Sequence, residues 1–343
     1  MFSGIVLNFS RPYRPGDWIS IDGSTDGRVI EMNWRATHVL TAKRDLAIVP
    51  NSTIAKSKIV NASSPSGIHG MTVTVQLASK TPPAASAEIL RHAILNTRLI
   101  LPVPAPLVVV KSISADSTEF DISFFVEELA HSSRAQNELF DWISRHLAAA
   151  GIALAATQNQ PYGTPQTADP KHAKNAAERA VDLVAIFAEL TAEEHKTLAA
   201  KAGHKHYDEG EALVEPGTVL RSLFIIGGGV VSLTAVVSEG EIEFLRLGPG
   251  DHFGEIGMLT GQPAEATLKA IAPVTTYELA KEDLAPVFEA RPEVSHELSG
   301  ARPAPGGRSV DRLGRYRQNR AAAASGRVVS DRLHRLFDLA NAE

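Results

Sequence analysis

Short apolar runs alternate with polar residues over the first 62 positions, and this alternation predicts β-strands. The runs are separated by pairs of turn-forming residues: Asp22-Gly23, Asp26-Gly27 and Arg44-Asp45. Such pairs favour tight hairpins, because their residues tolerate the backbone angles that a short turn needs. The pattern therefore predicts a small β-barrel over residues 10–66. Its predicted strands are 18–21, 27–32, 35–40 and 46–49, after which a short helix or loop ends at Asn61.

A second pattern, over residues 67–154, mixes strand and helix periods. The first stretch alternates strictly with period two, and the next carries apolar residues at the helical spacing i, i+3, i+4. A strand–helix–strand–strand–helix order is the ferredoxin-like arrangement, so we predict an α/β sandwich. Gly151 is expected to follow the last helix as its C-terminal cap. The predicted elements are a strand 69–77, a helix 83–99, strands 107–113 and 119–126, and a helix 132–150.

The next segment, residues 155–177, is rich in Gln, Pro, Thr and Ala and predicts a semi-extended linker. A third domain is expected over residues 178–302. Thr191 and Glu194 have the spacing of a capping box that begins a helix. After His204, short β runs with glycine turns every 8–12 residues predict an antiparallel β-roll, and residues 281–289 return to a helical pattern. The predicted fold class is therefore α+β multidomain.

The most distinctive stretch for chemistry lies in the predicted β-roll, at Leu247–Thr267. Its glycines, Gly254 and Gly257 among them, allow positive φ or a close approach of the backbone to a ligand. A short helix that starts near Glu255 would direct free N–H groups toward an anion. We interpret this stretch as an anion-binding loop.

Phe253-Gly254-Glu255 resembles the opening of the phosphate-binding cassette in cyclic-nucleotide-binding domains. The resemblance implies that Glu255 accepts the ribose 2′-hydroxyl, and that the amides of Gly254, Ile256 and Gly257 help to hold the sugar and the phosphate. It also implies a contact from Thr267 to phosphate or purine. The alternatives are that Glu255 caps the cassette turn and that Thr267 is an ordinary strand residue.

The cassette departs from the family pattern at its far end. The family has Pro-Arg-x-Ala-Thr, where this chain has Pro263-Ala264-Glu265-Ala266-Thr267. The arginine that would neutralise the phosphate is replaced by Ala264, and a carboxylate follows it. A charge-assisted hydrogen bond contributes about 1.5–3 kcal/mol, which is roughly ten- to a hundred-fold in affinity. We therefore expect weak binding of cAMP or cGMP, or none, and no required cofactor. The helix expected to close over the base, from Pro292, is interrupted by prolines, which is a second departure.

Residues 2–65 resemble the middle barrel domain of the small-conductance mechanosensitive channel family, through Phe9–Asp17 and Val49-Pro-Asn-Ser52. A ferredoxin-like domain follows an SH3/Sm-like barrel in that family, and its bacterial cyclic-nucleotide-gated subfamily adds a C-terminal nucleotide domain. The resemblance implies that residues 1–9 are the last turns of a pore helix. It further implies a homo-oligomeric ring, heptameric in the type case, which lies on the cytosolic side of the inner membrane.

Composition limits the other interpretations. No apolar run approaches the roughly 18–20 residues that span a bilayer. We expect that the sequence is a truncated reading of a longer channel gene, whose transmembrane helices would anchor it in the membrane. The alternative is a soluble oligomeric sensor or scaffold that has lost its pore.

Catalytic and metal-binding chemistry is not expected. The sequence has no cysteine, nucleophile elbow, P-loop or paired-carboxylate motif. His204 and His206, with Asp208, have no further ligand, so we predict no metal site. The tail, residues 303–343, is rich in arginine and has a pattern for a short helix over 328–339. Nucleic-acid binding is not expected, because only Tyr316 interleaves with the tail's arginines and the net charge is −5.

Overall fold

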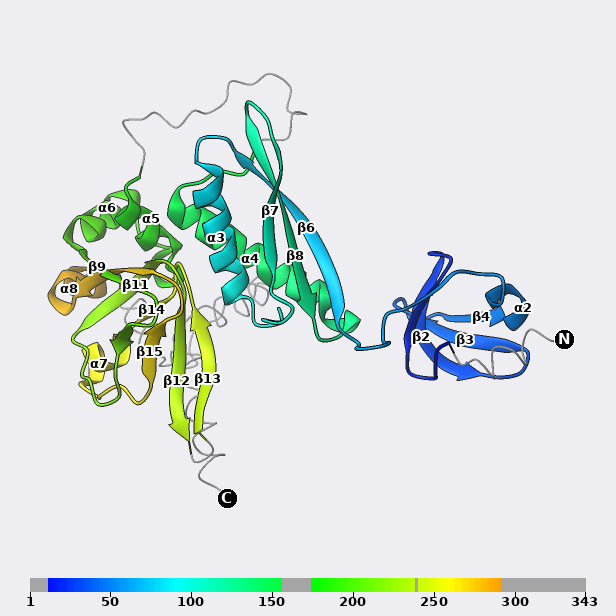
Figure 1. Ribbon diagram of the computed structural model, residues 1–343. Coiled ribbons are helices and arrows are strands. Elements are labelled where there is room, and N and C mark those ends of the chain that lie inside the picture. Colours follow the sequence, from blue (N-terminus) through cyan, green and yellow to red (C-terminus); the bar gives the residue numbers. More distant parts are fainter. Residues whose placement is uncertain (1–11, 156–173, 238–239, 292–343) are drawn as a thin grey trace, which may run out of the picture. The chain divides into compact units, whose positions relative to one another are not determined.

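The computed structural model describes residues 12–155, 174–237 and 240–291 (Figure 1). Several expectations lie outside these residues: the end of a pore helix at 1–9, most of the linker, the closing helix after Pro292, and the tail. The chain divides into two compact units. The first holds residues up to Thr74 with Arg98–Leu107 and Asp121–Glu138, and the second holds Val75–Thr97, Val108–Phe120 and the described residues from Leu139 onward.

The N-terminal domain is a five-stranded antiparallel sheet with the order β4-β3-β2-β1-β5. It encloses an apolar core that includes Tyr13, Ile19, Val29 and Val39. The four predicted strands are confirmed, with β2 beginning slightly earlier than expected. The elements are β1 (Trp18–Ile21), β2 (Thr25–Met32), β3 (Ala36–Thr41), β4 (Leu46–Pro50), α2 (Asn51–Ile54) and β5 (Ile59–Asn61).

The expectation of a helix or loop up to Asn61 is only partly right, because a fifth strand, β5, follows α2. This strand pairs antiparallel with β1, for example Ser20 with Val60. Asp22 fixes the residue directly before this strand, because the Lys58 N–H donates to Asp22 Oδ1 at 2.8 Å. Three residues without flanking turn pairs carry almost no local strand signal, so tertiary pairing decides their conformation.

A buried polar chain fixes the turn into α2. The Tyr13 hydroxyl lies 3.0 Å from Thr37 Oγ1, and Thr37 donates to Asn51 Oδ1 at 3.1 Å. Asn51 Nδ2 in turn donates to the Asn33 carbonyl at 2.9 Å. Since buried polar groups without partners are costly, this network favours one register of β3 and β4 around the barrel core.

The second domain has the predicted strand–helix–strand–strand–helix order. Its sheet has the order β6-β8-β7. Alternate residues of β8, including Phe120, Ile122 and Phe124, are fully buried, which is the period expected of a half-buried strand. The elements are β6 (His69–Ala78), α3 (Pro83–Asn96), β7 (Leu107–Ile113), β8 (Ser117–Val126), the short 3₁₀ turn η1 (Leu129–His131) and α4 (Ser132–Ala150).

The third domain is a β-roll of two four-stranded sheets, β10-β15-β12-β13 and β14-β11-β16-β9, with helices α5, α6 and α8 (Figure 1). Alternate side chains of strand β11 pack into two different cores. Phe224 and Ile226 face the interior of the roll, whereas Leu223 and Ile225 pack with the helices. The fold-class prediction is confirmed. The elements are α5 (Ala176–Leu183), η3 (Ala185–Phe187), α6 (Ala192–Lys201), β9 (Gly203–Tyr207), β10 (Ala212–Val214), β11 (Ser222–Gly228), β12 (Val231–Val237), β13 (Gly240–Leu247), β14 (His252–Phe253), α7 (Glu255–Thr260), β15 (Thr267–Ala270), β16 (Val274–Ala280) and α8 (Lys281–Ala290).

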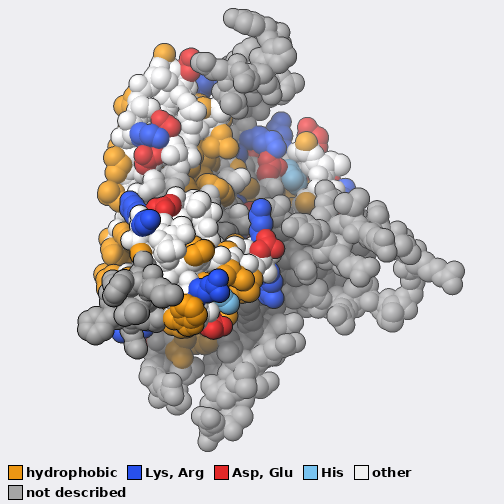
Figure 2. Space-filling view, turned by 90° about the vertical axis from the view of Figure 1, so that its right-hand side faces the viewer, with side chains coloured by type: hydrophobic (Ala, Val, Ile, Leu, Met, Phe, Trp, Pro, Cys, Tyr) orange, Lys and Arg blue, Asp and Glu red, His pale blue; other side chains and the backbone are white. Residues whose placement is uncertain are grey.

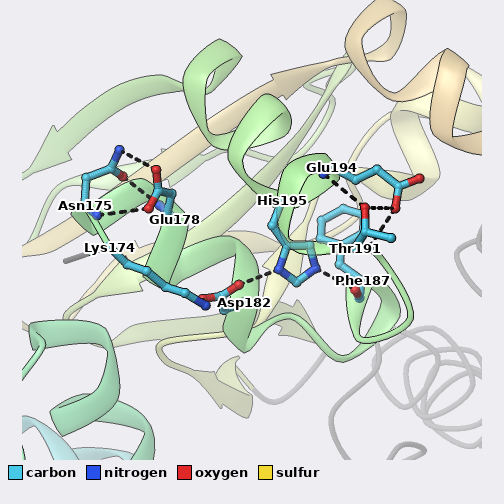
Figure 3. Close-up of polar contacts among 8 residues, drawn as sticks. All are labelled: Lys174, Asn175, Glu178, Asp182, Phe187, Thr191, Glu194 and His195. Carbon is cyan, nitrogen blue, oxygen red and sulfur yellow. Dashed lines mark hydrogen bonds and ion pairs between the residues drawn. The ribbon is translucent and has the colours of Figure 1, made fainter. Parts of the chain in front are cut away.

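Two capping boxes set the starts of α5 and α6 (Figure 3). The box of Thr191 and Glu194 confirms the prediction, and a second one joins Asn175 to Glu178. Between the helices, the His195 ring contacts Asp182 through Nδ1 and the Phe187 carbonyl through Nε2 at 2.8 Å.

Hydrophobic side chains also reach the surface among charged ones (Figure 2). In the barrel, Ile30 of β2 and Leu46 and Ile48 of β4 are at least half exposed. None of the helices in the described ranges combines the length and the apolar character that a bilayer crossing demands.

Candidate nucleotide-binding site

The cassette begins where the backbone leaves β14 and enters α7. Gly254 has φ +95°, and a Cβ there would lie 2.4 Å from the Ser222 carbonyl oxygen. A Cβ at Gly257 would lie 2.5 Å from the Leu220 carbonyl oxygen. Both glycines are therefore required by the close approach of the cassette to the start of β11. Leu220 and Ser222 were missed by sequence reasoning, because a glycine does not reveal which strand it approaches.

Glu255 is the first residue of α7 and is only 7% exposed. Its Oε2 atom has no hydrogen-bond partner among the described residues. Buried polar side chains are nearly always paired, so an unpaired carboxylate oxygen marks a place where a ligand donor would be stabilising. A hydroxyl group, such as that of a ribose, is a donor of the right kind.

His252 lies beside this carboxylate and was not predicted. It is buried, and its Nδ1 atom has no partner among the described residues. Burial lowers the pKa of His252, and the negative charge of Glu255 opposes that shift. The start of the cassette thus holds two buried side chains with unused hydrogen-bonding atoms.

Within the described residues, the far end of the cassette has no buried side chain with an unused hydrogen-bonding atom. Ala264 packs against the apolar core of the roll, and its backbone pairs with the loop before β11, where its N–H donates to the Thr218 carbonyl at 2.8 Å. Glu265 is exposed. Thr267 is the first residue of β15 and pairs with Thr234 of β12. Where the family pattern has the guanidinium of an arginine, the structure therefore has the methyl group of Ala264, and the carboxylate of Glu265 follows it.

The remaining predicted residues are placed as follows. Gly254, Glu255, Ile256 and Gly257 are contiguous at the start of α7, where Ile256 is 39% exposed. The histidines considered for a metal lie on β9, where the His204 ring packs 5.6 Å from the Tyr277 ring.

The chain matches three families of protein domain. Residues 1–64 match "Mechanosensitive ion channel, beta-domain", and residues 69–154 match "Mechanosensitive ion channel MscS, C-terminal". Residues 204–291 match "Cyclic nucleotide-binding domain". The chain joins mechanosensitive-channel domains to a cyclic nucleotide-binding domain. The two resemblances seen in the sequence are thus confirmed.

Individual relatives each cover one part of the chain. The low conductance mechanosensitive channel YnaI of Escherichia coli is 33% identical over 94 residues, 27% of this chain and 26% of its own. The cAMP-dependent protein kinase type II regulatory subunit of Drosophila melanogaster is 30% identical over 93 residues, 27% of this chain and 25% of its own. The chain therefore spans about a quarter of the length of these two curated relatives.

Among solved structures, the closed state of Helicobacter pylori MscS is similar at 20% identity with a TM-score of 0.43. The match covers 48% of this chain and 64% of that one.

Proposed function

We propose that this chain is the cytosolic vestibule and regulatory portion of a mechanosensitive-type ion channel, in which the C-terminal β-roll modulates gating. The observation that carries the proposal is the succession of two channel domains and a nucleotide-binding domain in one polypeptide. In this proposal the pore-forming helices lie outside the given sequence, at the inner membrane. The chain acts by binding and conformational change, not by catalysis.

In this proposal the roll binds cAMP or cGMP weakly or not at all, and a bound cyclic nucleotide would be held mainly through its sugar. The buried, unpaired oxygen of Glu255 supports a contact to the ribose 2′-hydroxyl, and Gly254, Ile256 and Gly257 would offer their amides to the sugar and phosphate. Thr267 would contact the phosphate or the purine from the start of β15. Because Ala264 supplies no positive charge, the affinity for cAMP or cGMP is low.

Self-association into a ring is the second part of the proposal. Ile30 of β2 and Leu46 and Ile48 of β4 are apolar and at least half exposed, and such side chains are of the kind that protein interfaces cover. Replacement of Ile48, which is 60% exposed, by lysine should reduce the oligomer mass measured by light scattering without lowering the melting temperature. An unchanged oligomer would exclude β4 from the contact.

A chimaeric channel tests the proposal. The chain would be joined behind the transmembrane part of E. coli YnaI, and pressure-activated currents would be recorded from membrane patches. A matched control would end at residue 154 and lack the roll. We expect current from both proteins and a different pressure threshold in the control. Equal thresholds would contradict modulation by the roll, and loss of current from both properly inserted proteins would contradict the channel assignment.

A further inference from the structure

The turn between β13 and β14, residues 247–251, lies directly before the cassette and is packed unusually closely. Gly250 has φ +85°, and a Cβ there would lie 2.9 Å from Leu183 Cβ. A Cβ at Gly248 would lie 2.7 Å from Asn96 Oδ1 and 2.8 Å from Trp142. Trp142 and Asn96 belong to helices α4 and α3 of the channel-type domain, within the same compact unit as the roll.

A partly buried ion pair joins this turn to α4. Arg145 Nη2 lies 2.6 Å from Asp251 Oδ1, and the side chains are 19% and 10% exposed. The Arg145 guanidinium also lies 4.3 Å from the centre of the Trp142 ring, and Asp251 Oδ2 accepts the Gly248 N–H at 3.0 Å. Burial raises the pKa of Asp251, and the charge of Arg145 opposes that shift. The carboxylate thus depends on α4 for its counter-ion.

Neutral hydrogen bonds join the same turn to α3. Asn96 Nδ2 donates to the Leu247 carbonyl at 3.2 Å, and Asn96 Oδ1 lies 2.7 Å from His146 Nε2. Burial lowers the pKa of His146 to about 3, so the ring is neutral near pH 7 and its Nε2–H donates to Asn96. Next to the turn, the Arg246 guanidinium of β13 adds a charged hydrogen bond from Nη1 to the Leu95 carbonyl of α3 at 2.5 Å. The turn is therefore held by side chains from two helices.

The turn is also continuous with the cassette. The Ile226 N–H donates to the Asp251 carbonyl, and the Gly250 N–H donates to the Ile226 carbonyl, both at 2.9 Å. The Phe253 ring then stacks on Phe224 at 5.1 Å, and Gly254 follows. Asp251 is thus separated from Glu255 only by the two residues of β14 and by Gly254.

We propose that the turn 247–251 couples the state of the cassette to helices α3 and α4 of the channel-type domain, with the Arg145–Asp251 pair as its central contact. This coupling rests on the proposed function only in one respect, namely that α3 and α4 would pass the change on to channel gating. Coupling requires one element whose arrangement depends both on the cassette and on the channel-type domain. The turn is such an element, because its backbone bonds to β11 beside the cassette and it also bonds to side chains of α3 and α4.

Hydrogen–deuterium exchange on the full chain tests the coupling without a ligand. Gly257→Ala displaces the cassette, because its Cβ would collide with the Leu220 carbonyl. We expect peptides of α3 and α4 to exchange about tenfold faster in this variant, since local opening follows local stability. In an Asp251→Asn background, Gly257→Ala should add no further change in these peptides. Glu278→Gln is the control, because it removes a carboxylate of the roll that pairs with Lys205 and not with the turn.

Two results would overturn the coupling: unchanged α3 and α4 peptides while the cassette exchanges faster, or an equal effect of Gly257→Ala with and without Asp251. If Gly257→Ala unfolds the whole roll, as shown by lost protection in β11 and β16, Leu220→Ala takes its place with the same expected outcomes, because the Leu220 side chain lies beside Gly254 of the cassette. The experiment needs no membrane, so its result is independent of whether the chimaera conducts.

Discussion

Two buried carboxylates, Asp251 and Glu255, lie within one stretch of chain, and they differ in what surrounds them. Each residue is 7% exposed. Asp251 is paired with Arg145 and accepts the Gly248 N–H, whereas Glu255 Oε2 has no partner among the described residues. The first is satisfied by the protein itself and serves the structure. The second is left unsatisfied, as the proposed contact to a ribose hydroxyl requires, so burial alone does not distinguish a structural carboxylate from one proposed to meet a ligand.

The largest effect should come from breaking the satisfied pair. Arg145→Met leaves Asp251 buried without a counter-ion, so we expect the free energy of unfolding to fall by about 3 kcal/mol at pH 7. Burial already raises the pKa of Asp251, and the variant raises it further. An acid whose pKa is raised by folding destabilises the folded state at high pH but not at low pH, where the acid is protonated in both states. The loss of stability should therefore shrink as the pH falls toward 4. Denaturant unfolding at several pH values measures both.

The matched control for that change is Lys205→Met. Lys205 pairs with Glu278 at 2.8 Å, but its side chain is 50% exposed, so its removal should change the stability by less than about 1 kcal/mol. A similar loss from both variants would mean that the Arg145–Asp251 pair is an ordinary surface contact.

The next effect concerns the missing charge in the cassette. Ala264→Arg restores a guanidinium, and we expect it to raise the affinity for cAMP or cGMP by roughly ten- to a hundred-fold, which corresponds to about 1.5–3 kcal/mol. Titration calorimetry measures the change, and Ala264→Met controls for size without charge. Sub-micromolar binding by the unaltered chain would show that the arginine is replaced by another cation.

The smallest effect should come from the unsatisfied carboxylate. Glu255→Gln removes a buried charge that lacks a full set of partners, so we expect the free energy of unfolding to rise by about 1 kcal/mol. In the Ala264→Arg background the same substitution should weaken cyclic nucleotide binding by about tenfold. Thermal unfolding and calorimetry provide the two readouts. A loss of stability would show that Glu255 has a structural partner.

Much of the fold could be predicted because its signals are local. The hairpin pairs of the barrel, the ferredoxin-like order and the Thr191–Glu194 capping box each depend on residues only a few positions apart. Strand β5 was missed because three residues become a strand only by pairing with β1.

The site could be predicted only in part, for the same reason. The Phe253-Gly254-Glu255 motif and the loss of arginine at Ala264 are visible in the sequence. The Arg145–Asp251 pair joins residues 106 positions apart, and no local pattern indicates it. The unpaired state of Glu255 is likewise a property of packing, since an exposed glutamate would look identical in the sequence.

Transmission from the cassette through the turn to the channel-type domain is the central claim. The most direct test records the pressure threshold of the YnaI chimaera that carries Ala264→Arg, with and without cAMP, and again after Asp251→Asn is added. We predict that cAMP shifts the threshold in the first protein and leaves it unchanged in the second. An equal shift in both would contradict the account.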